Sequence, residues 1–369
     1  MSKLEELIQQ LCPDGVECRN LEECCNILDK KRKPVTKAAR EAGEYRYYGA
    51  NGIQDYVSDY IFDGTFVLVG EDGSVITKAG TPVVTWAEGK IWVNNHAHII
   101  EEKTGVLLRY LFHYIQTIDV TSLIHGNIPK LTGGDFKTLK ISIPPLEIQR
   151  EIVRILDNFT ELTAELTAEL TARKKQYEYY QTKLFSFGDA TVYMPLAEIA
   201  EIGTGSSNTN EELAEGKYPF FVRSQDVRRK NEYEYDETAI ITSGDGVGVG
   251  KIFHYIEGKY ALHQRAYRIH ITDERIIPKY FYYYMKATFL PYIEKASFHS
   301  SVTSIRRPML NKFPVPVVSI DQQNRIVSIL DRFDVLCNDL TSGLPAEIEA
   351  RQKQYEYYRD KLLTFKPLA

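Results

Sequence analysis

Apolar residues recur at intervals of three and four along two stretches of the chain. In the first stretch they are Ile152, Ile155, Leu156, Phe159, Leu162, Leu166, Leu170, Tyr177, Tyr180 and Leu184. The spacing averages roughly 3.5 residues, which is typical of a coiled-coil seam. Glu, Lys, Arg and Gln occupy the other faces. As one helix, residues 146–187 would span about 60 Å, which is more than a compact domain requires.

The second stretch repeats this spacing but contains two helix breakers. Its apolar positions are Ile326, Ile329, Leu330, Phe333, Leu336, Leu340, Leu344, Ile348, Tyr355, Tyr358 and Leu362. Gly343 and Pro345 lie within the seam, where proline is expected to break or kink the helix and to restart it from its first turn. The two apolar stripes can bury each other. From periodicity alone, an ordinary helical hairpin or a dimerisation arm stays an open alternative.

A block of short alternating runs precedes each helical stretch. Segments such as "GTFVLVGEDGSVIT", "GKIWVNNHAHII" and "KYALHQRAYRIHIT" alternate apolar and polar residues and are separated by Gly, Asn and Asp turn signals. Each block also contains one expected helix, near "VLLRYLFHYIQ" in the first and "PKYFYYYMKATF" in the second. The pattern predicts α+β domains with a curved or barrel-like sheet.

The chain is an internal duplication with a period of about 174 residues. "ARKKQYEYYQTKLFSF" at 172–187 returns as "ARQKQYEYYRDKLLTF" at 350–365, with eleven of sixteen positions identical. "LEIQREIVRILDNF" at 146–159 returns as "IDQQNRIVSILDRF" at 320–333. The helical blocks stay alike while the larger blocks diverge. This indicates one scaffold function performed twice and one recognition function performed differently in each half.

This repeat divides the chain of 369 residues, which has room for two or three domains, into four regions. The predicted regions are a first variable domain at 1–143, a central conserved helix at 144–187, a second variable domain at 188–316 and a C-terminal conserved helix at 317–369. The central helix contains the four-residue sequence TAEL in tandem, and we call each copy a TAEL word. The words continue both the helix and the apolar seam, so the central helix could change length in steps of four residues.

Polar side chains able to contact bases or phosphates gather in both variable blocks. A net charge of −5 lowers the expectation of a nucleic-acid partner, although whole-chain charge can hide local patches. Arg, Lys, Asn and Gln carry donors that match guanine and adenine edges. The candidate DNA-binding residues are Lys31, Arg32, Lys33, Asn51, Asn94, Asn95, His96, His125, Asn127, Lys130, Arg223, Gln225, Arg228, Arg229, Lys230, His263, Gln264, Arg265, Arg306 and Arg307. For any single residue, a solvated surface position is the alternative.

None of the common catalytic motifs that we compared with the sequence is complete. In "GDGVGVGK" at 244–251, Asp245 stands where a phosphate loop needs its first glycine, and Ile252 stands where Ser or Thr should bind magnesium. A glycine-rich strand or turn is therefore predicted there. No Asn-Pro-Pro-Tyr, HExxH or GxSxG motif occurs, so no catalytic residue is predicted.

Metal sites and disulfides are not predicted either. His96 and His98 alternate on an expected strand, where surface or DNA-contact roles are favoured over a metal pair. The cysteines, Cys12, Cys18, Cys24, Cys25 and Cys337, lack paired CxxC spacing and are expected to be reduced thiols.

The order of these features resembles the specificity subunit of type I restriction-modification systems. The features are a variable domain, "IPPLEIQREIVRILDNF", the TAEL words, "QYEYYQTKLF", a second variable domain and a second helical copy. The resemblance covers the whole chain and is closest to the subgroup with tandem TAEL words in its central spacer.

The resemblance implies a division of labour among subunits. Two target recognition domains would each read half of a bipartite, asymmetric double-stranded DNA sequence, held apart by two long antiparallel coiled-coil helices. Two methyltransferase subunits would dock on this frame, and restriction subunits would join through the complex. S-adenosylmethionine, ATP and Mg would be bound in those partners, with no cofactor in this chain. The residues expected in the spacer and in subunit docking are Leu162, Leu166, Leu170, Tyr177, Tyr180, Tyr355 and Tyr358.

Two other functions stay open from sequence. One is a duplicated coiled-coil adaptor without DNA binding, and the other is a DNA methyltransferase that acts alone.

The start "MSKLEELIQQ" lacks a basic region followed by an apolar core, and no run of 18 apolar residues occurs. We therefore expect a cytoplasmic protein without a membrane span.

Overall fold

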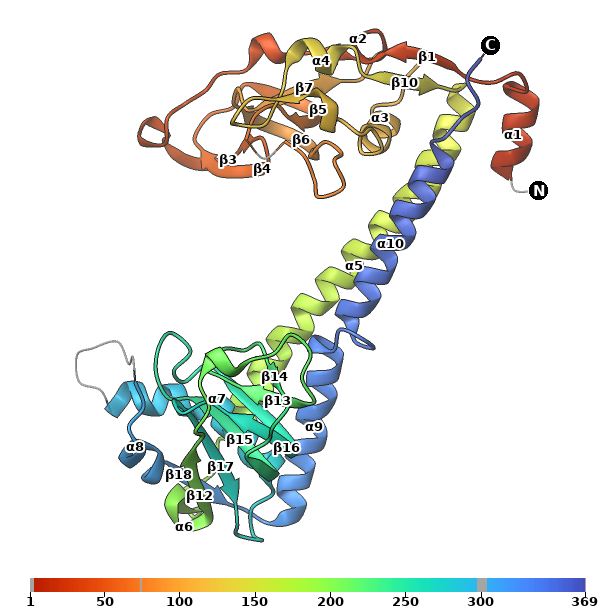
Figure 1. The fold of residues 1–369 in the computed structure, drawn as a ribbon. Coiled ribbons are helices and arrows are strands. Elements are labelled where there is room, and N and C mark those ends of the chain that lie inside the picture. Colours follow the sequence, from red (N-terminus) through yellow and green to blue (C-terminus); the bar gives the residue numbers. More distant parts are fainter. Residues whose placement is uncertain (1–2, 74, 297–303, 369) are drawn as a thin grey trace. The chain divides into compact units, whose positions relative to one another are not determined.

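The computed structural model describes residues 3–73, 75–296 and 304–368, and these form two compact units (Figure 1). The N-terminal unit contains Met1–Leu166 and Ile348–Ala369, and the C-terminal unit contains Thr167–Glu347. Each unit therefore combines one sheet domain with parts of the long helices. The division falls within the helices rather than at their ends, so the limits of the four predicted regions stay a prediction.

The N-terminal unit consists of short helices around one large sheet, followed by the start of a long helix. Its elements are α1 (Lys3–Leu11), β1 (Glu17–Asn20), α2 (Leu21–Cys24), β2 (Asn26–Ile27), β3 (Ala42–Gly49), β4 (Gly52–Val57), β5 (Phe62–Gly70), β6 (Val84–Val93), β7 (Ala97–Glu101), α3 (Leu108–Ile115), β8 (Ile124–His125), β9 (Lys130–Leu131), α4 (Gly133–Lys137), β10 (Lys140–Ile143) and α5 (Leu146–Leu184).

The C-terminal unit repeats this plan. Its elements are β11 (Val192–Pro195), α6 (Leu196–Ile199), β12 (Ala200–Thr204), β13 (Tyr218–Phe221), β14 (Arg228–Lys230), β15 (Tyr235–Ser243), β16 (Phe253–Leu262), β17 (Ala266–Ile271), α7 (Pro278–Ala296), α8 (Arg307–Asn311), β18 (Pro314–Val317) and α9 (Ile320–Asn338). The last helix, α10 (Leu344–Leu362), begins in this unit and belongs to the N-terminal unit from Ile348 onward. The predicted helices near 106–116 and 278–289 correspond to α3 and α7. The glycine-rich segment at 244–251 is a turn, as predicted.

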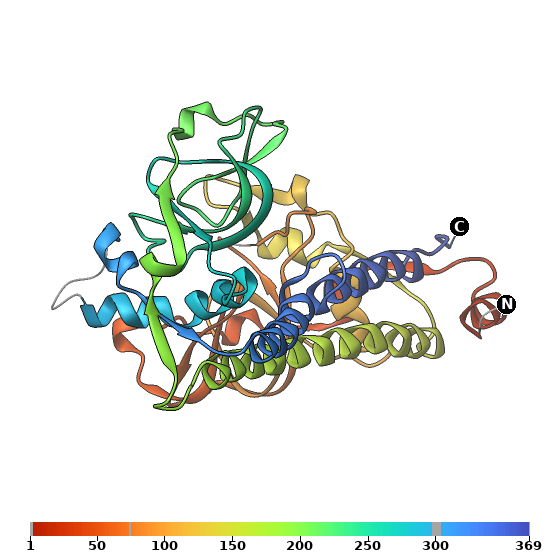
Figure 2. The same ribbon diagram turned by 90° about the horizontal axis from the view of Figure 1, so that it is seen from below.

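The two large sheets have the same strand order. The first runs β2-β7-β5-β6-β3-β4 and the second runs β12-β17-β15-β16-β13-β14. In each sheet one pair is parallel, β3 with β6 and β13 with β16, and the other pairs are antiparallel. The strands of the second sheet curve visibly in Figure 2. The internal duplication therefore extends through the divergent blocks to their topology.

Helices α3 and α7 attach the sheets to the long helices. In the N-terminal unit the core includes Leu108 and Leu111 of α3 together with Ile152 and Leu156 of α5. In the C-terminal unit α7 packs on α9, and its aromatic residues share a core with Ile326 and Leu330. In the described part of the chain, no helix is long and apolar enough to cross a membrane.

A buried glutamine fixes each attachment with the same three hydrogen bonds. Gln149 Oε1 accepts from the N–H of Leu107 at 2.9 Å, and Gln323 Oε1 accepts from the N–H of Ile277 at 2.8 Å. The side-chain Nε2 groups donate to carbonyl pairs, Gly105 and Pro144 in the first unit, Arg275 and Val318 in the second. The repeated glutamine therefore links the sheet domain to the long helix in the same way in both units. We call this junction the joint of each unit.

The helical stretches differ from each other as the sequence predicts. Residues 146–184 form one uninterrupted helix, whereas the second stretch is broken between α9 and α10. Pro345 lies in the first turn of α10. A Cβ added to Gly343 would stand 2.4 Å from the carbonyl oxygen of Val335, so only glycine fits at this break. The predicted break is confirmed.

Candidate nucleic-acid interface

The connections β6–β7 and β16–β17 have the same backbone path. β5 lies between β6 and β7 in the sheet, and β15 lies between β16 and β17, so each connection crosses the end of a central strand. The N–H of Glu71 donates to the carbonyl of His96 at 2.9 Å, and the N–H of Gly244 donates to the carbonyl of Arg265 at 2.9 Å. We call residues 94–96 and 263–265 the crossover turns.

Each crossover turn begins with a buried polar residue. Asn94 is 2% exposed and its side-chain oxygen accepts from the N–H of His96 at 2.8 Å. His263 is 3% exposed and its Nδ1 accepts from the N–H of Arg265 at 3.0 Å. Burial, followed by the charges of Arg223 and Arg265, lowers the pKa of His263, which favours the neutral ring that this hydrogen bond needs.

The other two residues of each turn are exposed. These are Asn95 and His96 in the first turn, and Gln264 and Arg265 in the second, and buried residues flank both pairs. We call these four the tip residues. The backbone is held by buried groups, and among the tip side chains Gln264 also donates from Nε2 to Asn208 Oδ1.

In each unit, an aspartate that lies just after the central strand, β5 or β15, contacts the basic tip residue. Asp72 pairs with His96 Nδ1, and Asp245 Oδ2 lies 3.3 Å from Arg265 Nη1. Asp245 also accepts from Arg223 through its other oxygen at 2.6 Å. Arg265 is 60% exposed and Arg223 39% exposed, so both guanidinium groups keep donors toward solvent.

An open hollow adjoins each turn. The hollow of the N-terminal unit, about 350 Å³, is lined by Asn51, Gln54 and His96 among others. That of the C-terminal unit, about 340 Å³, is lined by Gln264, Arg265 and Arg306 among others. The structure thus brings together two groups of predicted residues, Asn51 with Asn95 and His96, and Arg223 with Gln264, Arg265 and Arg306.

Two of the predicted DNA contacts need correction. Asn94 and His263 are buried and serve the backbone of their turns, so neither can reach a base in this conformation. The sequence pattern did not show this because an amide and an imidazole are equally suited to surface contacts. His96 and His98 also do not share a strand face: His96 precedes β7, whereas His98 lies inside it and is 1% exposed.

Other predicted residues are engaged in ion pairs within their domains. Arg32 Nη1 lies 2.6 Å from Glu71, in a cluster where His98 Nδ1 contacts Asp29 at 2.6 Å. The carboxylates of Asp29 and Glu71 with His98 are close enough for a metal site, but Arg32 and Lys130 already supply cations to it. We read this cluster as an ion-pair network.

In the C-terminal unit, the basic strand β14 faces acidic partners. Lys230 Nζ contacts Glu211 at 2.6 Å and Ser207 Oγ at 2.9 Å, and Arg228 pairs with Glu212. Arg307 donates to the carbonyl of Ile202 at 2.6 Å. The remaining candidates, Lys31, Lys33, Asn127, Gln225 and Arg229, are exposed, and the side chain of His125 lies outside the described residues.

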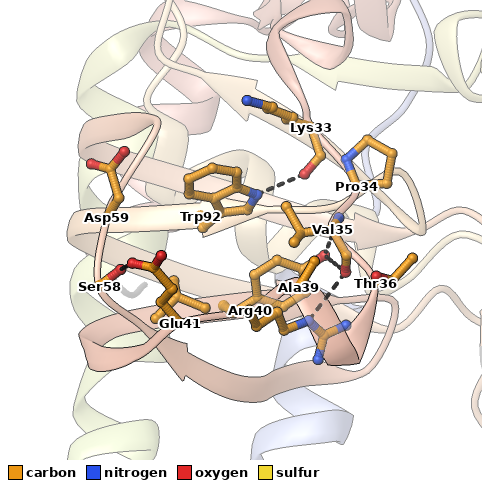
Figure 3. A pocket seen from close by; sticks show the side chains of 12 residues that line it. Lys33, Pro34, Val35, Thr36, Ala39, Arg40, Glu41, Ser58, Asp59 and Trp92 are labelled. Carbon is orange, nitrogen blue, oxygen red and sulfur yellow. Dashed lines mark hydrogen bonds between the residues drawn. The ribbon is translucent and has the colours of Figure 1, made fainter.

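Lys33 borders an aromatic cavity of about 470 Å³ in the N-terminal unit (Figure 3). Trp92 forms part of its wall and donates from Nε1 to the carbonyl of Lys33 at 2.6 Å. The guanidinium of Arg40 lies 4.1 Å from the ring centre of Tyr47. The cavity therefore combines an aromatic surface with cations, and within its lining the hydroxyl of Ser58 donates to the carboxylate of Glu41 at 3.1 Å.

Sequence reasoning missed the two aspartates and the equivalence of the turns. A signal was present: "EGKIWVNNHA" at 88–97 and "EGKYALHQRA" at 257–266 share Glu-Gly-Lys and the closing Ala. Aligned on these residues, Asn94 matches His263 and the tip residues match one another. The match is hard to see in sequence because only four of ten residues are identical.

These features define a duplicated recognition protein: two sheet domains of one topology, each presenting a different exposed pair on an equivalent turn. A family model described as "Type I restriction modification DNA specificity domain" matches residues 13–173 and again residues 190–350. The chain belongs to this family. The prediction of a non-catalytic specificity subunit with two recognition domains is confirmed, and the adaptor without DNA binding is not favoured.

Relatives support this over the whole length of the chain. A putative type I restriction enzyme specificity subunit of Haemophilus influenzae is 34% identical and is matched over 98% of both chains. The EcoR124I/EcoR124II specificity subunit of Escherichia coli is 36% identical over 70% of this chain and 71% of its own. The crystal structure of a type I S subunit from M. genitalium has a TM-score of 0.65 at 17% identity, covering 94% of this chain and 96% of that one. That likeness shows the fold.

Proposed function

We propose that each sheet domain reads one half of a bipartite, asymmetric sequence in double-stranded DNA. The observation that carries the proposal is the pair of crossover turns, which share a backbone and present different base-reading side chains. Two domains of equal topology and unequal surface chemistry are suited to two half-sites of unequal sequence.

We further propose that the long helices form an antiparallel coiled-coil spacer. In the N-terminal unit, Phe159 of α5 stacks on Tyr358 of α10 with ring centres 5.4 Å apart. In the C-terminal unit, Tyr177 of α5 stacks on Phe333 of α9 at 5.8 Å. The partner number falls as the α5 number rises, which is the order that antiparallel helices require. Half-buried Leu162, Leu166 and Leu170 continue the seam between these contacts.

The TAEL words would then set the length of the spacer, as in the subgroup that this sequence resembles. One word of four helical residues adds about 6 Å and rotates the rest of the helix by roughly 40°. A base-pair step is about 3.4 Å and about 34°. One word therefore corresponds to one or two base pairs of separation between the half-sites.

Two methyltransferase subunits would dock on this frame, bind S-adenosylmethionine and methylate adenines. Tyr180 and Tyr358, which are 38% and 40% exposed, offer aromatic contacts for them. Restriction subunits that use ATP and Mg would join through the complex, which we expect in the cytoplasm. Positive surface from the partners would offset the net charge of −5 on this chain.

A gel-shift experiment tests the proposal. The purified chain, assembled with its methyltransferase subunits, should bind its target duplex more tightly than a scrambled duplex, and the affinity should fall steeply as salt rises. An assembled complex that binds no DNA, or binds every sequence equally, would contradict the DNA-reading function. Methyl transfer by this chain alone would instead support the methyltransferase alternative.

A further inference from the structure

We propose that the tip residues, Asn95 with His96 and Gln264 with Arg265, are the base-reading residues of their domains, positioned by Asp72 and Asp245. The inference rests on the proposed DNA-reading function and narrows twenty candidate residues to two equivalent pairs. It also assigns Asn94 and His263 the separate task of shaping the turns.

The first argument is the separation of scaffold and contact residues. Each turn holds its backbone mainly through a buried acceptor and through a hydrogen bond from the residue that follows the central strand, with one further side-chain bond from Gln264 Nε2 to Asn208 Oδ1. The exposed pair can therefore differ between the two halves at little cost in stability. Such a site can change its sequence preference without losing its fold.

The second argument is the chemistry of the C-terminal tip. Arg265 matches the O6 and N7 acceptors of guanine, and Gln264 matches the N6 and N7 edge of adenine. Asp245 contacts Arg265 at 3.3 Å and Arg223 at 2.6 Å, which restricts a long side chain that otherwise has many rotamers. A guanidinium held in this way loses less freedom when it binds a base edge.

The third argument is that the N-terminal tip has the same plan with different groups. Asp72 accepts from Nδ1 of His96, which leaves Nε2 to face solvent or DNA. Asn95 beside it carries an amide that matches adenine. The hollow lined by His96 and Asn51 gives a base edge room to approach.

Two alanine pairs test the inference in the assembled complex. Asn95→Ala with His96→Ala should relax discrimination at one or two base pairs of one half-site, and Gln264→Ala with Arg265→Ala should do so in the other. We expect discrimination against single base-pair changes to fall roughly tenfold or more at those positions. Duplex competition binding and sequencing of methylated sites measure this position by position.

The chain offers matched control variants. Lys90 and Lys259 follow the repeated Glu-Gly pair within β6 and β16, four residues before Asn94 and His263, and both are exposed. Lys90→Ala and Lys259→Ala each remove a surface charge from the same strand, and they should leave base preference unchanged. Tip variants that weaken all sequences equally would show phosphate contacts instead and would overturn the inference.

Asp245→Asn tests the positioning role separately. It should relax discrimination at the same base pair as Arg265→Ala, because it removes the charge that Arg265 and Arg223 share. Relaxation at a different base pair, or at none, would contradict the role of Asp245. A wild-type complex without any bipartite preference would defeat the proposed function itself. Tip variants that keep an intact wild-type preference would defeat only the tip inference.

Discussion

The glutamine at the start of each long helix shows how one side chain can join two elements. Gln149 and Gln323 are fully buried, and each satisfies one backbone N–H and two backbone carbonyl groups. These backbone groups belong to the connection before α3 or α7 and to the segment before α5 or α9. Because buried polar groups without partners are costly, the glutamine fixes the approach of the helix to its sheet domain.

Gln149→Leu should therefore destabilise the N-terminal unit. It removes three hydrogen bonds while roughly preserving volume, and each buried group left unpaired costs about 1–3 kcal/mol. We expect the free energy of unfolding of the full chain to fall by about 3 kcal/mol or more in a urea titration. Gln323→Leu is the matched comparison and should cost a similar amount. A change within experimental error in both would show that solvent satisfies these groups.

We expect His113 to make the N-terminal unit sensitive to pH. It is fully buried, donates from Nε2 to Asp157 at 2.9 Å and accepts from the hydroxyl of Tyr355 at Nδ1, also at 2.9 Å. Burial lowers the pKa of His113, against the raising effect of its hydrogen bond to Asp157, and the nearby Arg109 and Arg359 also lower it. The neutral ring is therefore the form that the folded chain favours.

Protonation of His113 is coupled to unfolding, so the free energy of unfolding depends on pH. The unfolded chain has the higher His113 pKa, so it binds the proton first as pH falls below about 6.5, and stability falls with it. His113→Gln keeps a donor and an acceptor without titrating. Urea unfolding between pH 8 and pH 5.5 should show a smaller loss of stability in the variant than in the wild type. Equal losses would contradict this account.

At the scale of elements, the long helix carries the most predictable part of the structure. The bounds of α5 at residues 146 and 184 lie close to those expected from its apolar spacing, because that pattern is local and repeats over many turns. The break after α9 was also predictable, since Gly343 and Pro345 act through their own backbone.

For the sheets, the sequence predicted that strands occur but not the order in which they pair. Alternating residues indicated strands, but the order β2-β7-β5-β6-β3-β4 depends on pairings between distant segments that no local pattern contains. For the same reason the burial of Asn94 and the pairing of Arg265 with Asp245 were not foreseen. Such contacts arise because the crossover turn passes over another strand, and their spacing in sequence is irregular.

Deleting one TAEL word, residues 163–166, tests the spacer at this scale. The deletion removes about 6 Å of helix while Leu162 and Leu170 stay near the seam. We expect both half-sites to be kept and the gap between them to shorten by one or two base pairs, as measured from the methylated sites. A control deletion of two residues should disturb the seam and reduce assembly. An unchanged gap after the four-residue deletion would refute the spacer.

At the scale of the whole molecule, the duplication explains how a chain without a catalytic motif can direct chemistry. The same sheet order, joint glutamine and crossover turn occur in both halves, whereas the exposed residues of the turns differ. A net charge of −5 is compatible with this function if partner subunits supply much of the phosphate contact. The chain would then mainly supply sequence preference and spacing.

The central claim is that each half of the chain reads its own half-site. The most direct measurement is the set of methylated motifs in DNA from cells that express this chain with its methyltransferase subunits. The account predicts one bipartite, asymmetric motif with a fixed gap, in which exchanging the first sheet domain for that of a relative replaces one half-site and keeps the other. A continuous motif, or an exchange that changes both half-sites, would contradict it.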